Sequence, residues 1–345
     1  MSFQVTLQPS GHSFPASPDD TVLKAALDAG YTLPYGCRNG ACGSCKGSII
    51  SGTVEYPDIQ PQALTVVDVA AGKALFCCAQ ATSDLLIECR EVAAKDDIAP
   101  RILPCRVEKK VQLTHDVMAL YLKLPANERL QFMAGQYVEF LLKDGSRRAF
   151  SLANAPFDDG MLEIHARLIP DGTFTKYVFN EMPEKAIMRI EGPLGTFYLR
   201  EDSEKPIIFV AGGTGFAPIK GMIEHALHHG SKRSMVLYWG ALTKRDLYMP
   251  ELPEKWAAEH ANVKFIPVLS DPVPQDDWAG RTGFVHHAVM ADYPDLSAYE
   301  VYCCGAPGMV ESAYIDFVAR GLPEHEFFSD AFTYAPKPKL ATAPL

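Results

Sequence analysis

Residues 37–45 read Cys37-Arg38-Asn39-Gly40-Ala41-Cys42-Gly43-Ser44-Cys45, and the next cysteine along the chain is Cys77. This C-x4-C-x2-C…C spacing is typical of the thiolates that hold a [2Fe–2S] cluster. Three thiolates that converge from one short loop need positive φ angles and small side chains, which Gly36, Gly40 and Gly43 supply. The stretch therefore predicts an iron–sulfur site with Cys37, Cys42 and Cys45 as metal ligands and Cys77 as the favoured fourth ligand.

The alternatives to a cluster are structural zinc and ordinary core cysteines. Zinc sites usually combine one close cysteine pair with a second pair at similar spacing, which this chain lacks. The fourth ligand is open between Cys77 and its neighbour Cys78. Leu75-Phe76-Cys77 resembles the Leu-x-Cys end of plant-type ferredoxins and so favours Cys77. Cys78 is then expected to point away as a small buried hydrophobe.

Length and composition limit the class of protein. The 345 residues suggest two or three domains, and 48% hydrophobic with 21% charged residues is typical of a globular chain. The net charge of −10 makes nucleic acid an unexpected partner, because phosphate binding needs a basic surface. No apolar run approaches the about 18–20 residues of a membrane span, and the first residues do not resemble a signal peptide. We therefore expect a cytoplasmic protein with no membrane contact.

The chain outside the cysteine loop divides into further segments. In residues 1–92 we expect strands over 3–8, 48–56 and 84–88, and a helix over 22–29 capped by Asp19 or Asp20. Residues 93–103 contain Pro100, are followed directly by Pro104 and show no clear periodicity, so they are interpreted as a linker. Residues 104–203 carry short strand-like runs at a spacing that suggests a small barrel. The runs expected to form strands are 106–113, 117–124, 137–142, 149–152 and 162–168.

Residues 204–335 alternate between strand and helix patterns, which predicts a parallel α/β sheet. The expected strands are 207–211, 235–239, 263–269 and 301–304, and the expected helices are 214–229, 285–291 and 309–320. The Pro/Ala-rich residues 336–345 are interpreted as a flexible tail.

A second motif lies in the predicted barrel. Arg148-Ala149-Phe150-Ser151 follows a strand, and Gly172-Thr173-Phe174-Thr175 comes some way behind it. Together they resemble the FAD site of the ferredoxin–NADP reductase superfamily, although Phe150 replaces the usual tyrosine and Thr175 the usual serine. The resemblance implies that Arg148 pairs with the pyrophosphate, Phe150 packs on the isoalloxazine and Ser151 lies near flavin N5. Gly172 and Thr175 would open a helix whose N-terminus holds phosphate. His165 and Arg167 are further cofactor-binding candidates.

A third motif follows the first strand of the α/β segment. Gly212-Gly213-Thr214-Gly215 forms a glycine turn before a helix, which lets the backbone approach a pyrophosphate. It matches the Gly-Gly-Thr-Gly pattern of the same superfamily, and Cys304-Gly305-Ala306-Pro307 matches its Cys-Gly-x-Pro turn. The resemblance places Cys304 beside the nicotinamide and Gly305 in the binding turn. Asp330 and Phe332 resemble the terminal acidic-x-aromatic segment near the flavin, although a solvated acid and a core phenylalanine remain the alternative.

The resemblance covers residues 1 to about 333 and implies a β-grasp ferredoxin domain, an antiparallel β-barrel FAD domain and a parallel α/β nicotinamide domain. Within the superfamily the chain is most similar to the CDP-6-deoxy-3,4-glucoseen reductases, which serve a sugar dehydrase. Reductases of multicomponent, ring-hydroxylating oxygenases look similar. The implied activity is electron transfer from NADH, with NADPH as an alternative, through FAD and the cluster to a separate metalloenzyme. A self-contained diaphorase is the other enzyme hypothesis.

The implied chemistry places few demands on side chains. A nicotinamide gives up two electrons as hydride, whereas a [2Fe–2S] cluster accepts one, so a flavin between them can divide the pair. The protein has to align the cofactors rather than to supply an acid and a base. The candidate catalytic residues are accordingly those placed by motif at the hydride-transfer centre, namely Ser151, Cys304, Asp330 and Phe332.

Overall fold

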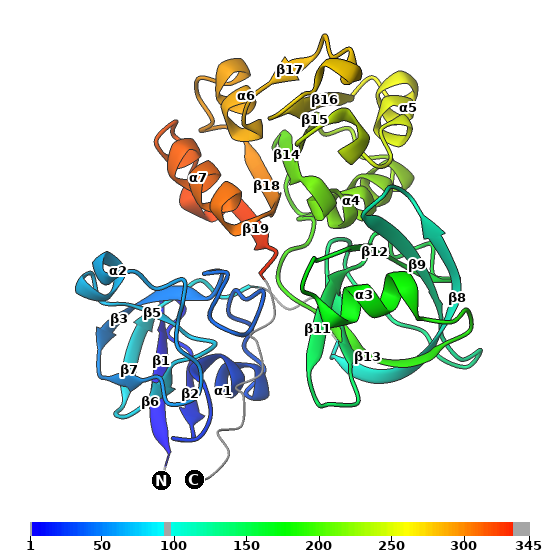
Figure 1. The fold of residues 1–345 in the computed structure, drawn as a ribbon. Coiled ribbons are helices and arrows are strands. Elements are labelled where there is room, and N and C mark those ends of the chain that lie inside the picture. Colours follow the sequence, from blue (N-terminus) through cyan, green and yellow to red (C-terminus); the bar gives the residue numbers. More distant parts are fainter. Residues whose placement is uncertain (1, 93–97, 334–345) are drawn as a thin grey trace, which may run out of the picture.

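A computed structural model describes residues 2–92 and 98–333. The predicted tail 336–345 and residues 93–97 of the predicted linker lie outside the described residues. Figure 1 shows three units, each built on its own sheet: blue to cyan at the N-terminus, blue-green to green in the middle, and light green through yellow to red at the C-terminal end. The first two units each enclose one apolar core, and the third has a core on each face of its sheet.

The first unit is a five-stranded sheet in the order β2-β1-β7-β3-β5, with a separate β4-β6 pair. Val5 and Leu7 of β1 are buried while their neighbours face outward, as the alternating sequence predicts. Helix α1 covers this core. The elements are β1 Phe3–Gln8, β2 Ser13–Ala16, α1 Val22–Asp28, β3 Lys46–Ser51, β4 Val54–Glu55, α2 Val66–Ala70, β5 Lys73–Leu75, β6 Gln80–Ala81 and β7 Leu85–Glu88.

Two local expectations for this unit were wrong. The N-cap of α1 is Thr21, whose hydroxyl accepts a hydrogen bond from Lys24 N at 3.2 Å, while Asp20 instead pairs with the Lys24 ammonium. The single strand expected over residues 48–56 is broken into β3 and β4. Gly52 lies at the break with φ +95°, and a Cβ there would come within 2.2 Å of the Asp84 carbonyl oxygen. The close backbone contact at Gly52 ends the strand. The alternation of apolar and polar residues gives no sign of such a contact.

The second unit is an antiparallel sheet in the order β11-β10-β13-β8-β9-β12. Strand β8 begins at Arg101, inside the segment interpreted as linker, because residues 101–106 pair with β13. The local sequence gives no sign of β13 or of this pairing. Pro104 is tolerated there because the pairing with β9 begins only at Arg106. The elements are β8 Arg101–Gln112, β9 Val117–Lys123, β10 Tyr137–Leu141, β11 Arg147–Ser151, β12 Leu162–Arg167, α3 Thr173–Asn180 and β13 Ile187–Leu194.

The third unit is a sheet in the order β17-β16-β15-β14-β18-β19, and each of its pairings is parallel. Helix α5 and the edge strands β17 and β19 were not expected from the sequence. The elements are β14 Ile207–Gly212, η1 Gly213–Gly215, α4 Phe216–His228, β15 Met235–Ala241, η2 Lys244–Asp246, α5 Glu251–Glu259, β16 Val263–Leu269, η3 Pro274–Asp276, β17 Arg281–Thr282, α6 Val285–Asp292, β18 Glu300–Gly305, α7 Pro307–Val318, η4 Glu324–Glu326 and β19 Phe327–Ala331.

The three units meet at the end of β19, which Figure 1 shows directed toward the junction of the other two. Asp330 of β19 lies beside the cysteine loop, since a Cβ on Gly36 would be 3.4 Å from its Oδ1 atom. Cys42 packs against the apolar cluster of the third unit. Within residues 2–92 and 98–333, no helix has both the length and the apolar character that crossing a membrane requires.

Candidate cofactor and electron-transfer site

The four predicted sulfur ligands converge in the first unit. Cys42 N donates to Cys37 Sγ at 3.3 Å, and Cys37 N donates to Cys42 Sγ at 3.4 Å. Cys77 N donates to Cys45 Sγ at 3.5 Å, so the other two cysteines form a second pair. Backbone N–H groups directed at sulfur are the contacts that stabilise thiolates and tune a cluster. Two adjacent cysteine pairs with such donors fit a [2Fe–2S] group.

The loop geometry explains the glycines around these sulfurs. Gly40 and Gly43 have φ angles of +78° and +80°, as expected, and Arg38 also adopts a positive φ of 56°. A Cβ on Gly40 would come within 2.7 Å of Cys78 Sγ. Gly36 is needed for space instead, because a Cβ there would lie 3.3 Å from Cys42 Sγ. The loop forms a cradle that larger residues would fill.

Cys77 and Cys78 differ in their surroundings although both are buried. Hydrogen bonds from Cys45 and then from Cys78 lower the pKa of Cys77 to about 4. The pKa of Cys78 is raised, first by its hydrogen bond to Cys77 and then by burial. The two Sγ atoms are 3.4 Å apart. This arrangement favours Cys77 as the thiolate and leaves Cys78 as the neutral neighbour.

The predicted flavin residues lie on β11 and at the start of α3. Phe150 packs against Phe174 of α3, with ring centroids 5.7 Å apart. Arg148 is half-buried on the same strand, and its Nη1 donates to the Arg147 carbonyl oxygen at 2.8 Å. Ser151 is buried at the end of β11. The strand therefore presents the aromatic ring, the guanidinium and the hydroxyl that FAD would require.

The turn before α3 is held by the predicted Gly-x-x-Thr segment. Thr175 Oγ1 accepts a hydrogen bond from Ile169 N at 3.0 Å. Gly172 is the N-cap, and a Cβ there would lie 2.7 Å from Thr175 Oγ1. The hydroxyl of Thr175 thus closes the turn, and no side chain caps the N-terminus of α3. The first backbone N–H groups of α3 are of the kind that binds phosphate.

The glycine turn of the third unit packs backbone against backbone. A Cβ on Gly215 would lie 2.0 Å from the Cys304 carbonyl oxygen, and one on Gly305 would lie 3.1 Å from Gly212 Cα. The turns after β14 and β18 therefore meet at the carboxyl edge of the parallel sheet, the usual position for a dinucleotide. Thr214 is buried in the turn. Only glycine allows the two turns to approach each other this closely.

Arg167 of the second unit reaches over this turn. A Cβ on Gly213 would lie 2.6 Å from Arg167 Nη1, so the guanidinium sits directly above the glycine. Arg167 Nε is 3.1 Å from Asp116 Oδ2, which orients the side chain. A cation held beside a glycine turn suits a pyrophosphate.

Cys304, Asp330 and Phe332 come together beside the turn that follows β18. Cys304 faces one core of the third unit and Cys303 the other, because alternate residues of β18 point to opposite faces. Burial raises the pKa of Cys304 well above its usual value, so it is a neutral thiol. Asp330 pairs with Cys304 in the sheet, and burial followed by the Cys42 charge raises its pKa to about 7. Phe332 N donates to the Gly305 carbonyl oxygen at 2.8 Å.

Family models match three successive parts of the chain. They are a 2Fe-2S iron-sulfur cluster binding domain over residues 5–82, an oxidoreductase FAD-binding domain over 104–198 and an oxidoreductase NAD-binding domain over 209–314. The chain is 41% identical over 332 residues to the CDP-6-deoxy-L-threo-D-glycero-4-hexulose-3-dehydrase reductase of Yersinia pestis, covering 96% of this chain and 99% of the relative. It belongs to the ferredoxin–NADP reductase superfamily.

Other relatives of this reductase have different named acceptors. The reductase component DmpP of phenol 2-monooxygenase from Pseudomonas sp. is 34% identical over 96% of this chain and 95% of the relative. Among solved structures, the Amycolatopsis cytochrome P450 reductase GcoB matches with a TM-score of 0.78 and 33% identity, covering 96% of this chain and 99% of that chain. The superfamily membership and the three matched domains show an NAD(P)H-dependent oxidoreductase.

A buried polar network that no sequence motif indicates joins the second and third units of the reductase. Lys220 of α4 bonds to Glu163 of β12 at 2.9 Å, and the other carboxylate oxygen of Glu163 contacts His165 Nε2 at 2.9 Å. His165 Nδ1 lies 3.0 Å from Tyr248 Oη. The structure thus places His165 in an interdomain contact with both ring nitrogens engaged. Its predicted role as a direct cofactor ligand remains a prediction.

The charges of this network follow from its contacts. Burial disfavours the ionised form of Glu163, but the hydrogen bond from His165 and the charge of Lys220 outweigh it and lower the pKa to about 2. Burial lowers the pKa of His165, so the ring is neutral. An ionised carboxylate only accepts, hence His165 Nε2 donates to Glu163 and Nδ1 accepts from Tyr248. Four buried groups are satisfied in one consistent arrangement.

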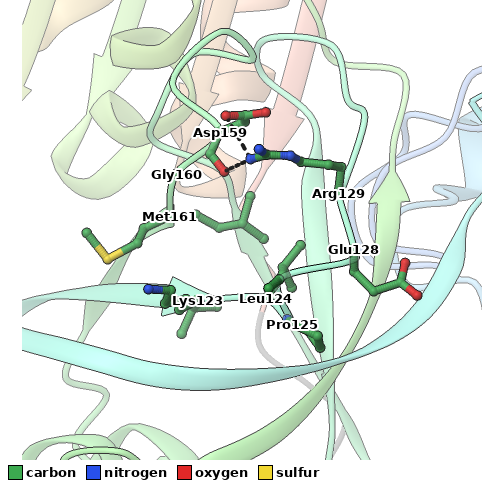
Figure 2. A pocket seen from close by; sticks show the side chains of 11 residues that line it. Lys123, Leu124, Pro125, Glu128, Arg129, Asp159, Gly160 and Met161 are labelled. Carbon is green, nitrogen blue, oxygen red and sulfur yellow. Dashed lines mark hydrogen bonds and ion pairs between the residues drawn. The ribbon is translucent and has the colours of Figure 1, made fainter.

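A hollow of about 190 Å³ lies elsewhere on the reductase, at one end of the second sheet. Figure 2 shows Arg129 beside it, bonded to the carboxylate and the carbonyl oxygen of Asp159. Its lining comes from residues 122–129 and 159–162, whereas the predicted cofactor residues lie on other segments. The hollow is therefore separate from the candidate site.

Proposed function

We propose that this reductase takes hydride from NADH onto FAD and passes electrons through the [2Fe–2S] cluster to a separate dehydrase that acts on a CDP-linked deoxyhexulose. The observation that carries the proposal is the 41% identity to dehydrase reductases along almost the whole of both chains. The oxygenase reductases compared are 33–35% identical. The arrangement of the three motifs around one junction supports it.

The site residues have distinct proposed roles. Arg148, Phe150, Gly172 and Thr175 would hold FAD, and Arg167 with residues 212–215 and 305 would hold the nucleotide pyrophosphate. Ser151, Cys304, Asp330 and Phe332 would surround the hydride-transfer centre, and Cys37, Cys42, Cys45 and Cys77 would hold the cluster. The bound flavin supplies the exchange between two-electron and one-electron chemistry. The residues of the chain orient the donors and exclude water.

The domain organisation is part of the proposal. We infer a β-grasp ferredoxin domain over residues 1–92, a linker that ends before β8, a FAD barrel to residue 203 and a parallel α/β domain over 204–335. An isolated bridge between Leu152 and Ile164 supports closure of the second sheet into a barrel. None of the nine cysteines forms a disulfide, which supports a reducing, cytoplasmic location.

The test reconstitutes the purified reductase with candidate acceptors. NADH-dependent turnover of the CDP-deoxyhexulose dehydrase is expected, together with an absorption spectrum of flavin plus [2Fe–2S] cluster. Turnover of an aromatic oxygenase instead would favour the second candidate function, which the 34% identity to DmpP supports. Reduction of small-molecule acceptors alone would indicate a diaphorase, and a colourless, zinc-containing protein would contradict the proposal.

We predict that NADH is preferred over NADPH. Related reductases often have an arginine at the position of Leu242, which follows β15 and is 64% exposed here. An apolar side chain does not bind a 2′-phosphate, whereas an arginine fork does. Lys244 and Arg245 lie nearby, but the Lys244 ammonium already contacts the Asp276 carbonyl oxygen at 3.4 Å. Measurement of kcat/KM for both nucleotides at fixed salt checks the preference.

A tenfold preference for NADPH, about 1.4 kcal/mol, would contradict that prediction. Lys244→Ala and Arg245→Ala identify the phosphate site in that case, because they would then abolish the preference. Lys255→Ala, on the exposed face of α5, is the control for loss of a surface charge.

We also predict that turnover with the protein acceptor weakens with salt. Residues 1–92 have five basic and nine acidic side chains, hence a net charge of −4. Lys24 and Lys46 are already paired with acids of the same unit. An acidic surface steers a basic partner, and added salt screens that attraction. Ordinary solubility charge is the alternative explanation.

The measurement compares acceptor turnover with NADH–ferricyanide turnover between about 20 and 300 mM salt, a range over which screening strengthens greatly. The ferricyanide reaction is the control because it does not need the partner. Identical salt dependence of the two reactions would exclude electrostatic docking.

A further inference from the structure

The cysteine loop is attached to the FAD-binding unit through the residues that flank Cys37. Tyr35 N donates to Thr196 Oγ1 at 3.0 Å, and Thr196 N donates to the Tyr35 carbonyl oxygen at 3.2 Å. Gly36 and Arg38 make further bonds to the same unit. The backbone around the first cluster ligand is therefore held by two units rather than by one.

Two side chains of β10 make the central contacts. Tyr137 Oη donates to the Gly36 carbonyl oxygen at 2.7 Å, and Arg38 Nη2 donates to Glu139 Oε2 at 2.6 Å. Tyr137 and Glu139 are two residues apart on one strand, so both point to the same side of the sheet. The two contacts hold Gly36 and Arg38, the residues on either side of Cys37 in the sequence.

Both contacts are built into the protein interior. Tyr137 is 5% exposed, and the Glu139 side chain is 8% exposed. A Cβ on Gly195 would lie 2.8 Å from the Tyr137 ring, so the ring position depends on a glycine. The same Glu139 oxygen accepts from Arg147 Nη1 at 3.0 Å. A buried carboxylate with two guanidinium partners is compensated and geometrically defined.

The same strand also adjoins the proposed flavin residues. Tyr137 is in register with Ser151 of β11, and Glu139 is in register with Ala149. The neighbouring strand therefore carries the flavin motif, while the side chains of β10 hold the cluster loop. The strand pair β10–β11 therefore connects the two proposed redox sites.

We propose that Tyr137 and Glu139 are positioning residues that hold the cluster loop at a set place relative to β11, and thereby set the rate of electron transfer from FAD to the cluster. This inference rests on the proposed function. In that step the flavin already reduced by NADH would lose one electron and the oxidised cluster would gain it. The rate depends on the separation and orientation of the two groups, which these contacts determine.

The experiment uses the full chain loaded with FAD and cluster, as Tyr137→Phe and Glu139→Gln variants. Anaerobic stopped-flow absorbance after mixing with NADH separates flavin bleaching from cluster reduction. We expect cluster reduction to slow at least tenfold in each variant while flavin bleaching stays within twofold. Iron content, FAD content and the cluster EPR spectrum should remain those of the wild type.

A second readout does not depend on activity. Amide hydrogen exchange in the segment 33–38 reports whether the loop remains attached, because the Tyr35 amide bonds across the interface. Exchange should accelerate in both variants. Glu191→Gln is the matched control, since Glu191 also pairs with Arg147 and none of its described ion pairs reaches the first unit. Both readouts should then match the wild type.

Arg38→Gln provides a check from the other side of the contact. The double variant Arg38→Gln/Glu139→Gln should slow cluster reduction by less than the two single effects combined. If the Glu139→Gln protein loses its cluster, the same measurements are made on Arg38→Lys. This variant keeps the positive charge but has a shorter side chain.

Three results would overturn the inference: unchanged cluster reduction in both variants, equal slowing of both phases, or the same slowing in Glu191→Gln. Wild-type protein that never reduces its cluster with NADH would instead refute the proposed function. Normal cluster reduction in wild type and variants alike would refute only the positioning role.

Discussion

A Cys42→Ser variant is expected to lose cluster absorbance and essentially all NADH-dependent reduction of cytochrome c, while it keeps reduction of ferricyanide. Cys42 forms one of the two sulfur pairs of the loop, and its backbone N–H donates to Cys37 Sγ. A serine hydroxyl is a poor substitute for a thiolate on iron. Ferricyanide accepts electrons directly from flavin, whereas a one-electron protein acceptor needs the cluster. Absorbance spectra and the two activities, measured on the same preparation, check the prediction.

Cys89→Ser is the matched control for this loss. Cys89 is a buried cysteine of the same unit, and burial raises its pKa to about 12, so it is a neutral core thiol. The control should keep both the cluster and cytochrome c reduction. Unchanged cytochrome c activity in the cluster-free Cys42→Ser protein would refute the proposed order of electron transfer.

Ser151→Ala and Cys304→Ala are expected to slow flavin reduction by NADH on the order of 100-fold while FAD stays bound, since a misplaced donor costs about that much. Both residues are proposed to lie at the hydride-transfer centre rather than at the phosphates. Arg148→Ala should behave differently and release FAD, because its guanidinium is the proposed pyrophosphate partner. Stopped-flow bleaching of the flavin and FAD retention after gel filtration measure the two effects.

Cys303→Ala is the matched control for Cys304→Ala. The two cysteines are adjacent on β18, both fully buried, and face opposite cores of the third unit. The control should reduce its flavin at the wild-type rate. Equal rates in Ser151→Ala, Cys304→Ala and the control would show that the motif assignment is wrong.

The local elements of the fold were predictable wherever burial follows a simple period. The alternating residues of β1 and the apolar runs of β14 and β18 were identified correctly to within about a residue at each end. Strands β13 and β19 were not predicted. Strand β13 contains Gly-Pro, and β19 has an acid in a buried position. Their pairing with distant strands compensates for residues that disfavour a strand locally.

The contacts between units were not predictable from sequence. Glu163 and His165 lie on one strand and Lys220 on a helix of the next unit, and only the fold brings the three into one buried network. The Arg38–Glu139 pair likewise joins residues that are about a hundred positions apart. Pairing over such distances depends on how the units pack, and no local period encodes it.

The sequence by itself determined the chemistry of this reductase. Cysteine spacing, glycine turns and the Arg-x-aromatic-Ser strand are short-range patterns, because the residues proposed to hold each cofactor lie mainly in a few short segments. Only the tertiary structure decided which side chains link one proposed site to another. Tyr137 and Glu139 contact the cysteine loop, and Arg167 lies over the glycine turn. Binding one cofactor is a local property, whereas the placement of one cofactor relative to another depends on contacts between units.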